Sequence, residues 1–281
     1  MKRILLTLAA FALLVLPCAT VRAADVLSLN LWAGAAPDES SAANAPSLDV
    51  WIPANQTSET CVLVLPGGAY QNLDLKEGAW VAKHFNERGI AAAVLHYRVP
   101  RREGRPKHLA PWQDAQRAVR ILRSRAVEWG FSPDKIGVLG WSAGGHLALM
   151  ASTTSLTNAY EPVDELDKLP CSVNFAIPIY PAYVLEDGAD GPNAGKGNDS
   201  PMVGDFSFDA ATPPTCLFHG DADAYSPMGS VAVYGRLRKL NVPAELHIYA
   251  CIPHGFAGHA ADDHVGDWIN RVDAWMTKLG F

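Results

Sequence analysis

The chain has 281 residues, of which 49% are hydrophobic and 19% are charged. This balance excludes an intrinsically disordered chain, because enough apolar surface is present to form a core. Acidic residues outnumber basic ones, 29 against 23, and no long basic run occurs. Electrostatic binding to nucleic acid or to an anionic membrane surface is therefore not expected.

The first residues have the pattern of a secretory signal. Lys2 and Arg3 precede an almost wholly apolar stretch over 4–16, which is too short to span a bilayer comfortably. Val21 and Ala23 place small residues at the −3 and −1 positions of a cut after residue 23. We expect a signal peptide over 1–23 and a secreted or periplasmic domain over 24–281, without stable membrane association after cleavage. The alternative is an uncleaved membrane anchor.

Past the signal, strand-like and helix-like segments alternate. Compact apolar or alternating runs predict strands over 26–31, 48–52, 61–65, 90–96, 136–139, 173–179, 215–218 and 244–249. Helical spacing and a cap at Asp74-x-x-Glu77 predict helices over 74–88, 112–129, 228–240 and 262–279. Repeated β-α-β units with apolar strands imply an α/β fold with a mostly parallel sheet and helices on both faces.

One long segment departs from this alternation. Residues 181–214 are rich in Gly, Asp, Asn and Pro and have little periodicity. Irregular segments of this length inside a compact domain usually serve a function. We expect this segment to shape one wall of a substrate pocket.

Export would place Cys61, Cys171, Cys216 and Cys251 in an oxidising compartment. Four cysteines allow three complete pairings, and the sequence does not choose among them. Four buried free thiols fit their apolar neighbours equally well. No two of them have the spacing of a zinc knuckle or a redox Cys-x-x-Cys.

A Gly-x-Ser-x-Gly motif with Ser142 at its centre follows directly on the predicted strand 136–139. A strand that turns sharply into a helix holds such a serine in a strained backbone, with Oγ exposed above the sheet. Gly140 and Gly144 are required because a Cβ at either position would clash. The motif predicts Ser142 as a nucleophile, and the alternative is an ordinary glycine-rich turn.

A serine nucleophile needs a base, which an acid orients. His254 follows the predicted strand 244–249, and Asp221 and Asp223 follow the strand 215–218. Asp223 lies far enough past its strand to reach the histidine, whereas Asp221 fits a local turn cap. The order Ser142, Asp223, His254 is the one expected on a parallel sheet of this kind.

The other histidines are weaker candidates for the base. His84, His96 and His247 lie in predicted regular elements, and His219 ends a strand. The remaining ones are His108 in a basic loop, His146 just after the motif, and His259 and His264, which flank two aspartates. The spacing of this last group does not supply a metal site, so we expect no metal.

Attack on an ester produces an oxyanion that needs backbone N–H donors. Ala143, directly after the nucleophile, supplies one. The loop after the strand 61–65 can offer Gly68 and Ala69. The alternative for this loop is a plain tight turn.

At these residues the chain resembles secreted α/β-hydrolases of the esterase/lipase superfamily, closest to the acetyl xylan esterase-like group related to hormone-sensitive lipase. The motifs that carry the resemblance are Pro66-Gly67-Gly68-Ala69-Tyr70, His96-Tyr97-Arg98, Asp114 with Arg117-Ala118-Val119-Arg120, the Ser142 motif with His146, His219-Gly220-x-x-Asp223, and His254-Gly255-Phe256. Pro66 replaces the histidine of lipase relatives, as in acetyl esterase-like ones, which weakens any inference toward long-chain lipids.

The resemblance implies an α/β-hydrolase domain over 24–281 with a triad of Ser142, Asp223 and His254. It also implies an oxyanion hole of Gly68, Ala69 and Ala143 and no cofactor. We expect Tyr70 and Trp141 to contact substrate, with packing as the alternative for Trp141. Arg98 and Asp114 are expected to form a structural ion pair.

The expected activity is hydrolysis of small acyl esters, with acetyl favoured, on a small molecule or a polysaccharide. One alternative is a serine peptidase of the prolyl oligopeptidase type, although the large propeller usual in that family does not fit this length. Another is a non-catalytic binding protein with a hydrolase fold. The oligomeric state is left open.

Overall fold

A computed structural model of the chain describes residues 26–39, 45–192, 199–258 and 265–281. The predicted signal over 1–23 lies outside these residues, as do the rival histidines His259 and His264. The signal therefore stays a prediction.

The core of the molecule is a sheet of eight strands in the order β1-β2-β4-β3-β5-β6-β7-β8. The strands are β1 (Val26–Asn30), β2 (Ser47–Trp51), β3 (Cys61–Leu65), β4 (Ala91–His96), β5 (Ile136–Trp141), β6 (Phe175–Ile179), β7 (Thr215–Gly220) and β8 (Ala244–Tyr249). The β2 strand is antiparallel to both of its neighbours, and the pairs from β4 to β8 are parallel. The predicted mostly parallel sheet is confirmed.

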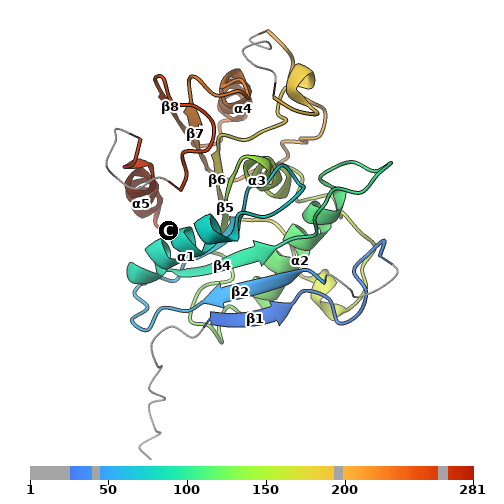
Figure 1. Ribbon diagram of the computed structural model, residues 1–281. Coiled ribbons are helices and arrows are strands. Elements are labelled where there is room, and N and C mark those ends of the chain that lie inside the picture. The colour runs from blue at the N-terminus through green and yellow to red at the C-terminus, as the bar shows by residue number, and fades with distance from the viewer. Residues whose placement is uncertain (1–25, 40–44, 193–198, 259–264) are drawn as a thin grey trace, which may run out of the picture.

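Helices cover both faces of this sheet (Figure 1). They are α1 (Leu75–Glu87), α2 (Leu109–Arg125), α3 (Ala143–Thr153), α4 (Met228–Lys239) and α5 (Trp268–Leu279). Buried side chains of α1 and α5 share one apolar cluster, and those of α2, α3 and α4 share the other. These two clusters are the layers that the alternating sequence pattern predicts.

Two helix boundaries show how local chemistry sets the elements. The carboxylate of Asp74 accepts a hydrogen bond from the Glu77 N–H at 3.3 Å, so the predicted cap of α1 is present. Helix α2 begins at Leu109 rather than 112, with Pro111 in its first turn, where a missing N–H costs nothing. It ends at Arg125, ahead of the predicted 129.

The expected ion pair of Arg98 and Asp114 is confirmed. Arg98 Nε lies 3.0 Å from Asp114 Oδ2, and Trp32 Nε1 donates to Asp114 Oδ1 at 3.1 Å. Both charged side chains are buried, so the pair fastens the end of β4 and the segment around Trp32 to α2.

The four cysteines between 61 and 251 are free thiols. Cys61, Cys171 and Cys216 are buried, as the free-thiol reading expects, whereas Cys251 is exposed. The expected burial of Cys251 is therefore wrong. This residue lies in the turn that follows β8, where its backbone is left-handed with φ 62°. Within the described ranges, the helices are all too short or too polar to cross a membrane.

Candidate active site

The backbone bends sharply at Ser142, between β5 and α3. Its φ of 57° and ψ of −121° lie in a region that residues with a Cβ rarely adopt. The Ser142 N–H donates to the Ile179 carbonyl at 3.0 Å, and its own carbonyl accepts from His146 N–H at 3.0 Å. The neighbouring strand and the helix together hold the bend in place.

Glycines make this bend possible by letting backbone segments approach closely. A Cβ at Gly140 would lie 2.3 Å from the Gly144 carbonyl oxygen. A Cβ at Gly144 would lie 2.0 Å from the Leu65 carbonyl oxygen, at the end of β3. Contacts this short exclude any side chain, so the steric reason expected for both glycines is confirmed.

Three polar side chains from separate loops form a hydrogen-bonded chain at this bend. Ser142 Oγ lies 2.8 Å from His254 Nε2. His254 Nδ1 lies 2.8 Å from Asp223 Oδ2 and 2.9 Å from Oδ1. Because the loops after β5, β7 and β8 leave the same edge of the parallel sheet, residues distant in sequence meet here. These distances suit proton transfer from a serine to a histidine that a carboxylate orients.

The Asp223 carboxylate is enclosed and well supplied with donors. Its side chain is buried, the Tyr225 N–H donates to Oδ1 at 2.7 Å, and His219 Nε2 lies 3.4 Å from Oδ2. Burial alone would raise the pKa of Asp223, but hydrogen bonds from His219 and His254 hold it below its ordinary value. Asp221, by contrast, is exposed, which leaves Asp223 as the acid in contact with His254.

Two tyrosines flank the His254 ring. Ring centroids of Tyr180 and Tyr225 lie 4.8 Å and 5.0 Å from that of His254. The Tyr180 hydroxyl accepts from the Ala257 N–H at 3.0 Å, which fixes the loop that carries the histidine. Sequence reasoning missed both residues, although the position of Tyr180 directly after β6 was an available signal.

The loop after β3 lies against the bend. Gly68, Ala69 and Tyr70 all have positive φ, and the Gln71 N–H closes the turn on the Gly68 carbonyl at 2.8 Å. A Cβ at Gly67 would lie 2.7 Å from Trp141 Cδ1, so little space separates this loop from β5. In the described part of the chain, no turn, loop or side-chain hydrogen bond uses the N–H groups of Gly68, Ala69 or Ala143.

An open groove of about 540 Å³ runs past Ser142 and His254. Gly68, Trp141 and Tyr180 line it, together with the first turn of α1, which includes Glu77. Burial, with help from the nearby Asp74 charge, raises the pKa of Glu77 to about 7. Its place in a helix cap was the only feature of Glu77 that could be predicted from the sequence.

Among the described residues, two expectations about the groove are not met. Tyr70 does not contact it, because the positive φ of 57° directs its side chain into the core, where its hydroxyl lies 3.0 Å from His146 Nδ1. The described residues of the 181–214 segment do not line the groove either. Asp205 and Phe206 of this segment instead lie against His146 in α3.

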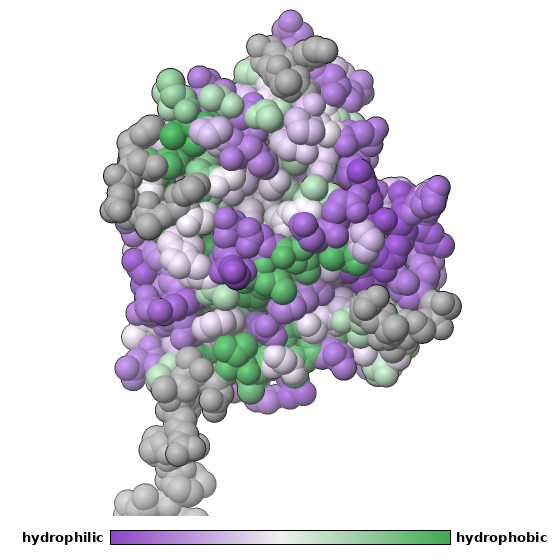
Figure 2. All heavy atoms as spheres, viewed as in Figure 1, coloured by the Kyte–Doolittle hydropathy of each residue, from purple (hydrophilic) through white to green (hydrophobic). Residues whose placement is uncertain are grey.

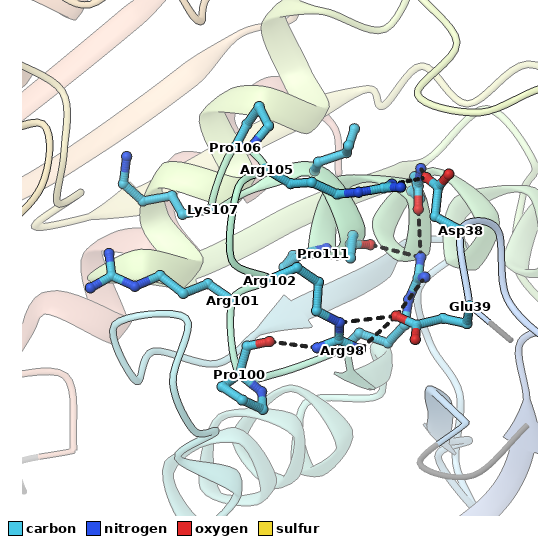
Figure 3. Close-up of a pocket in the computed structure, with 13 residues that line it drawn as sticks. Asp38, Glu39, Arg98, Pro100, Arg101, Arg102, Arg105, Pro106, Lys107 and Pro111 are labelled. Carbon is cyan, nitrogen blue, oxygen red and sulfur yellow. Dashed lines mark hydrogen bonds and ion pairs between the residues drawn. The ribbon is translucent and has the colours of Figure 1, made fainter. Parts of the chain in front are cut away.

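A second cavity, of about 220 Å³, lies beside the loop between β4 and α2. Hydrophilic side chains gather over this loop (Figure 2). Figure 3 shows Arg105 pointing at Asp38, and Arg98 and Arg102 at Glu39, with Arg101 and Lys107 on the opposite side. Neither Ser142 nor His254 lines this cavity. Most charged side chains of this second cavity already form ion pairs with one another. The groove beside Ser142 is therefore the better candidate for a catalytic site.

Two side-chain groups in the described ranges could hold a metal ion. One is His108, His146 and Asp205, and the other is Cys216, Glu245 and His247. Neither group includes Ser142, Asp223 or His254.

Comparison with known proteins identifies a matching family and relatives of similar sequence. The profile of the BD-FAE family matches residues 48–189. An acetylxylan esterase from Xylanibacter ruminicola is 28% identical over 82% of this chain and 46% of its own length. A probable carboxylic ester hydrolase, LipM, from Mycobacterium tuberculosis is 27% identical over 78% of this chain and 54% of its own. The chain thus spans about half the length of these relatives.

Solved structures agree on the fold. The acetyl ester-xyloside bifunctional hydrolase of Caldicellulosiruptor lactoaceticus superposes with a TM-score of 0.76 at 28% identity, over 91% of this chain and 97% of that one. Thermogutta terrifontis esterase 2, phosphorylated by paraoxon, has a TM-score of 0.72 at 22% identity, over 92% and 95%. The predicted α/β-hydrolase fold is confirmed.

Proposed function

The chain belongs to the BD-FAE family, and from that premise we propose that it is a serine ester hydrolase that removes small acyl groups, above all acetyl, from a carbohydrate. The observation that carries the proposal is the hydrogen-bonded chain from Ser142 through His254 to Asp223 at the floor of an open groove. The relatives named as esterases support the reaction class.

In this mechanism Ser142 Oγ attacks the ester carbonyl carbon while His254 Nε2 takes its proton. The tetrahedral oxyanion accepts hydrogen bonds from the N–H groups of Gly68, Ala69 and Ala143. The intermediate collapses as His254 returns the proton to the leaving alcohol, which leaves an acyl-enzyme. Water then attacks with His254 again as base. Asp223 holds the imidazole in the required tautomer and stabilises its protonated form.

The walls of the groove support a small acyl group on a hydroxyl-rich alcohol. Trp141 and the loop at Gly68 bound it on the side of the bend. The groove is also lined by residues 73–77, where Asp74, Lys76 and Glu77 alternate with two leucines and can offer polar groups to sugar hydroxyls. Acetyl esters of xylan fit both features, and they are also the substrate in the name of the Xylanibacter ruminicola relative.

Hydrolysis of p-nitrophenyl esters of increasing acyl length tests the proposal. Acetate should be the fastest, longer chains should react progressively more slowly, and the protein should release acetate from acetylated xylan. Ser142→Ala should abolish all of these activities, whereas Ser124→Ala, an exposed serine of α2, should not. Turnover that survives Ser142→Ala would contradict the nucleophile. Failure on every ester would instead favour a peptidase or a non-catalytic binder.

A further inference from the structure

We propose that His108, His146 and Asp205 form a binding site for one divalent transition-metal ion, best fitted to zinc, that fastens the 181–214 segment to the helix carrying the nucleophile. The three side chains come from the start of α2, from α3 and from the long irregular segment. No step of the proposed ester hydrolysis uses them, so this proposal is independent of that one.

Two of the three donor-atom separations are close to those around a tetrahedral ion. His108 Nδ1 and His146 Nε2 lie 3.4 Å and 3.7 Å from Asp205 Oδ2. All three donor atoms lie within 4.8 Å of one another. Zinc bonds to nitrogen and oxygen measure about 2.0–2.2 Å, so two ligands of a tetrahedral zinc lie about 3.4 Å apart. A single ion between the three atoms would therefore need only small adjustments of the side chains.

Both imidazole nitrogens that face this space lack a hydrogen-bond partner among the described residues. The His146 side chain is fully buried. Buried polar atoms without partners are rare in folded proteins because each one costs free energy. A bound cation would satisfy both nitrogens at once.

A second layer of contacts orients His146 for ligation. Its Nδ1 lies 3.0 Å from the Tyr70 hydroxyl. When Nε2 binds a metal, Nδ1 carries the proton and donates it to that oxygen, as the outer nitrogen of metal-bound histidines usually does. The ring of Phe206 lies 5.2 Å from that of His146 and shields one side of the site. This arrangement gives buried Tyr70 a structural role.

Charge and access also favour a cation here. The Asp205 side chain is 34% exposed, so an ion can enter from solvent and keep a water as its fourth ligand. Lys107 is the nearby cation, but its Nζ is directed toward Asp190, at 3.8 Å, and toward the Tyr183 ring, at 5.1 Å. Two imidazoles and one carboxylate suit zinc better than calcium or magnesium, which prefer oxygen ligands.

The group of Cys216, Glu245 and His247 provides a matched comparison. There His247 Nε2 already bonds to Glu245 Oε1 at 2.7 Å, so the imidazole is not left without a partner. Substitution of His247 removes a histidine of similar type without touching the proposed site.

Zinc and cobalt binding by the tag-free, chelator-stripped protein tests the proposal. We expect one zinc per chain by elemental analysis after dialysis, a higher Tm with zinc, and the visible absorption of tetrahedral cobalt. Asp205→Asn and His108→Gln should each weaken zinc binding by at least about 10-fold, since even outer-layer substitutions have that effect. His247→Gln should bind as the parent does, and circular dichroism checks that each variant is folded.

Three results would overturn the proposal. These are no stoichiometric zinc binding by the parent protein, unchanged affinity in both folded site variants, or loss of binding in His247→Gln.

Discussion

At the scale of single residues, the site depends on which groups hold protons. Asp223 receives donors from His254, Tyr225 and His219, and its lowered pKa keeps it ionised throughout the neutral range. An ionised Asp223 keeps the proton of neutral His254 on Nδ1, so that Nε2 is free to accept from Ser142. Each residue therefore fixes the protonation state of the next.

Asp223→Asn should lower kcat for p-nitrophenyl acetate by about 10⁴-fold, because the amide favours the wrong imidazole tautomer. Asp221→Asn is the matched control: it changes an exposed side chain two residues away and should leave kcat within about 2-fold. Equal losses in both variants, or a loss only at Asp221, would contradict the assignment of the acid.

Activity should rise from acid to neutral pH, because the base must be neutral to accept the serine proton and histidines lose their charge between about pH 5 and 8. The pH dependence of kcat/KM on p-nitrophenyl acetate measures this. Activity that is independent of pH over that range would argue against His254 as the base.

Glu77 should make the folded protein less stable as pH rises. Its pKa of about 7 in the folded state exceeds the value of about 4.3 of an exposed glutamate, so the folded state binds more protons between these values. Glu77→Gln should therefore raise Tm clearly more at pH 8 than at pH 5. Glu87→Gln, exposed at the other end of α1, should show no such difference. A shift of equal size at both pH values would contradict the account.

At the scale of elements, the close approach of α3 to β3 limits what the bend accepts. Gly144→Ala should lower the free energy of unfolding by about 1–3 kcal/mol in urea titrations, because its Cβ would meet the Leu65 carbonyl. Gly235→Ala in α4 should raise it by up to about 1 kcal/mol, since a Cβ there meets nothing within 4 Å. The two alanines differ only in their surroundings, so equal effects would refute the steric explanation.

Strand and helix patterns predicted most elements closely because apolar periodicity reports directly on burial. The bend at Ser142 was predictable because glycine spacing encodes its sterics. Tyr70 was placed wrongly because a left-handed backbone, which no local pattern announces, turns it into the core. The described part of the 181–214 segment does not line the groove as expected, because Asp205 contacts His108 and His146 instead.

At the scale of the whole molecule, the parallel strands deliver three loops to one edge of the sheet. The BD-FAE match covers 48–189 and thus includes Ser142, whereas Asp223 and His254 lie beyond it. Only the fold brings these two residues to the serine. The order of the three residues along the chain predicted that they would lie together. The positions of the tyrosines beside His254 and of Glu77 in the groove depend on long-range packing, which local sequence does not reveal.

At the opposite edge of the sheet lies β1, and the buried ion pair of Arg98 and Asp114 stabilises the segment that follows it. Apolar side chains gather over β1 in Figure 2, where Val26 and Leu27 are 39% and 40% exposed. The adjoining segment is held by the Trp32 bond to Asp114. Asp114→Ala should cost about 3–5 kcal/mol of unfolding free energy, because it removes the fully buried carboxylate that pairs with buried Arg98. Glu39→Ala, which removes a partly exposed partner of Arg98, should cost less than about 1 kcal/mol. Similar losses in both variants would contradict the role of burial.

Covalent labelling with paraoxon, followed by peptide mass spectrometry, tests directly whether Ser142 is the nucleophile. We expect one phosphoryl group per chain, on Ser142, with loss of esterase activity in proportion to labelling. The label should be absent from Ser142→Ala and should form more slowly in Asp223→Asn. Esterase activity that persists in a protein fully labelled at Ser142, or inactivation by a label on another residue, would contradict this assignment.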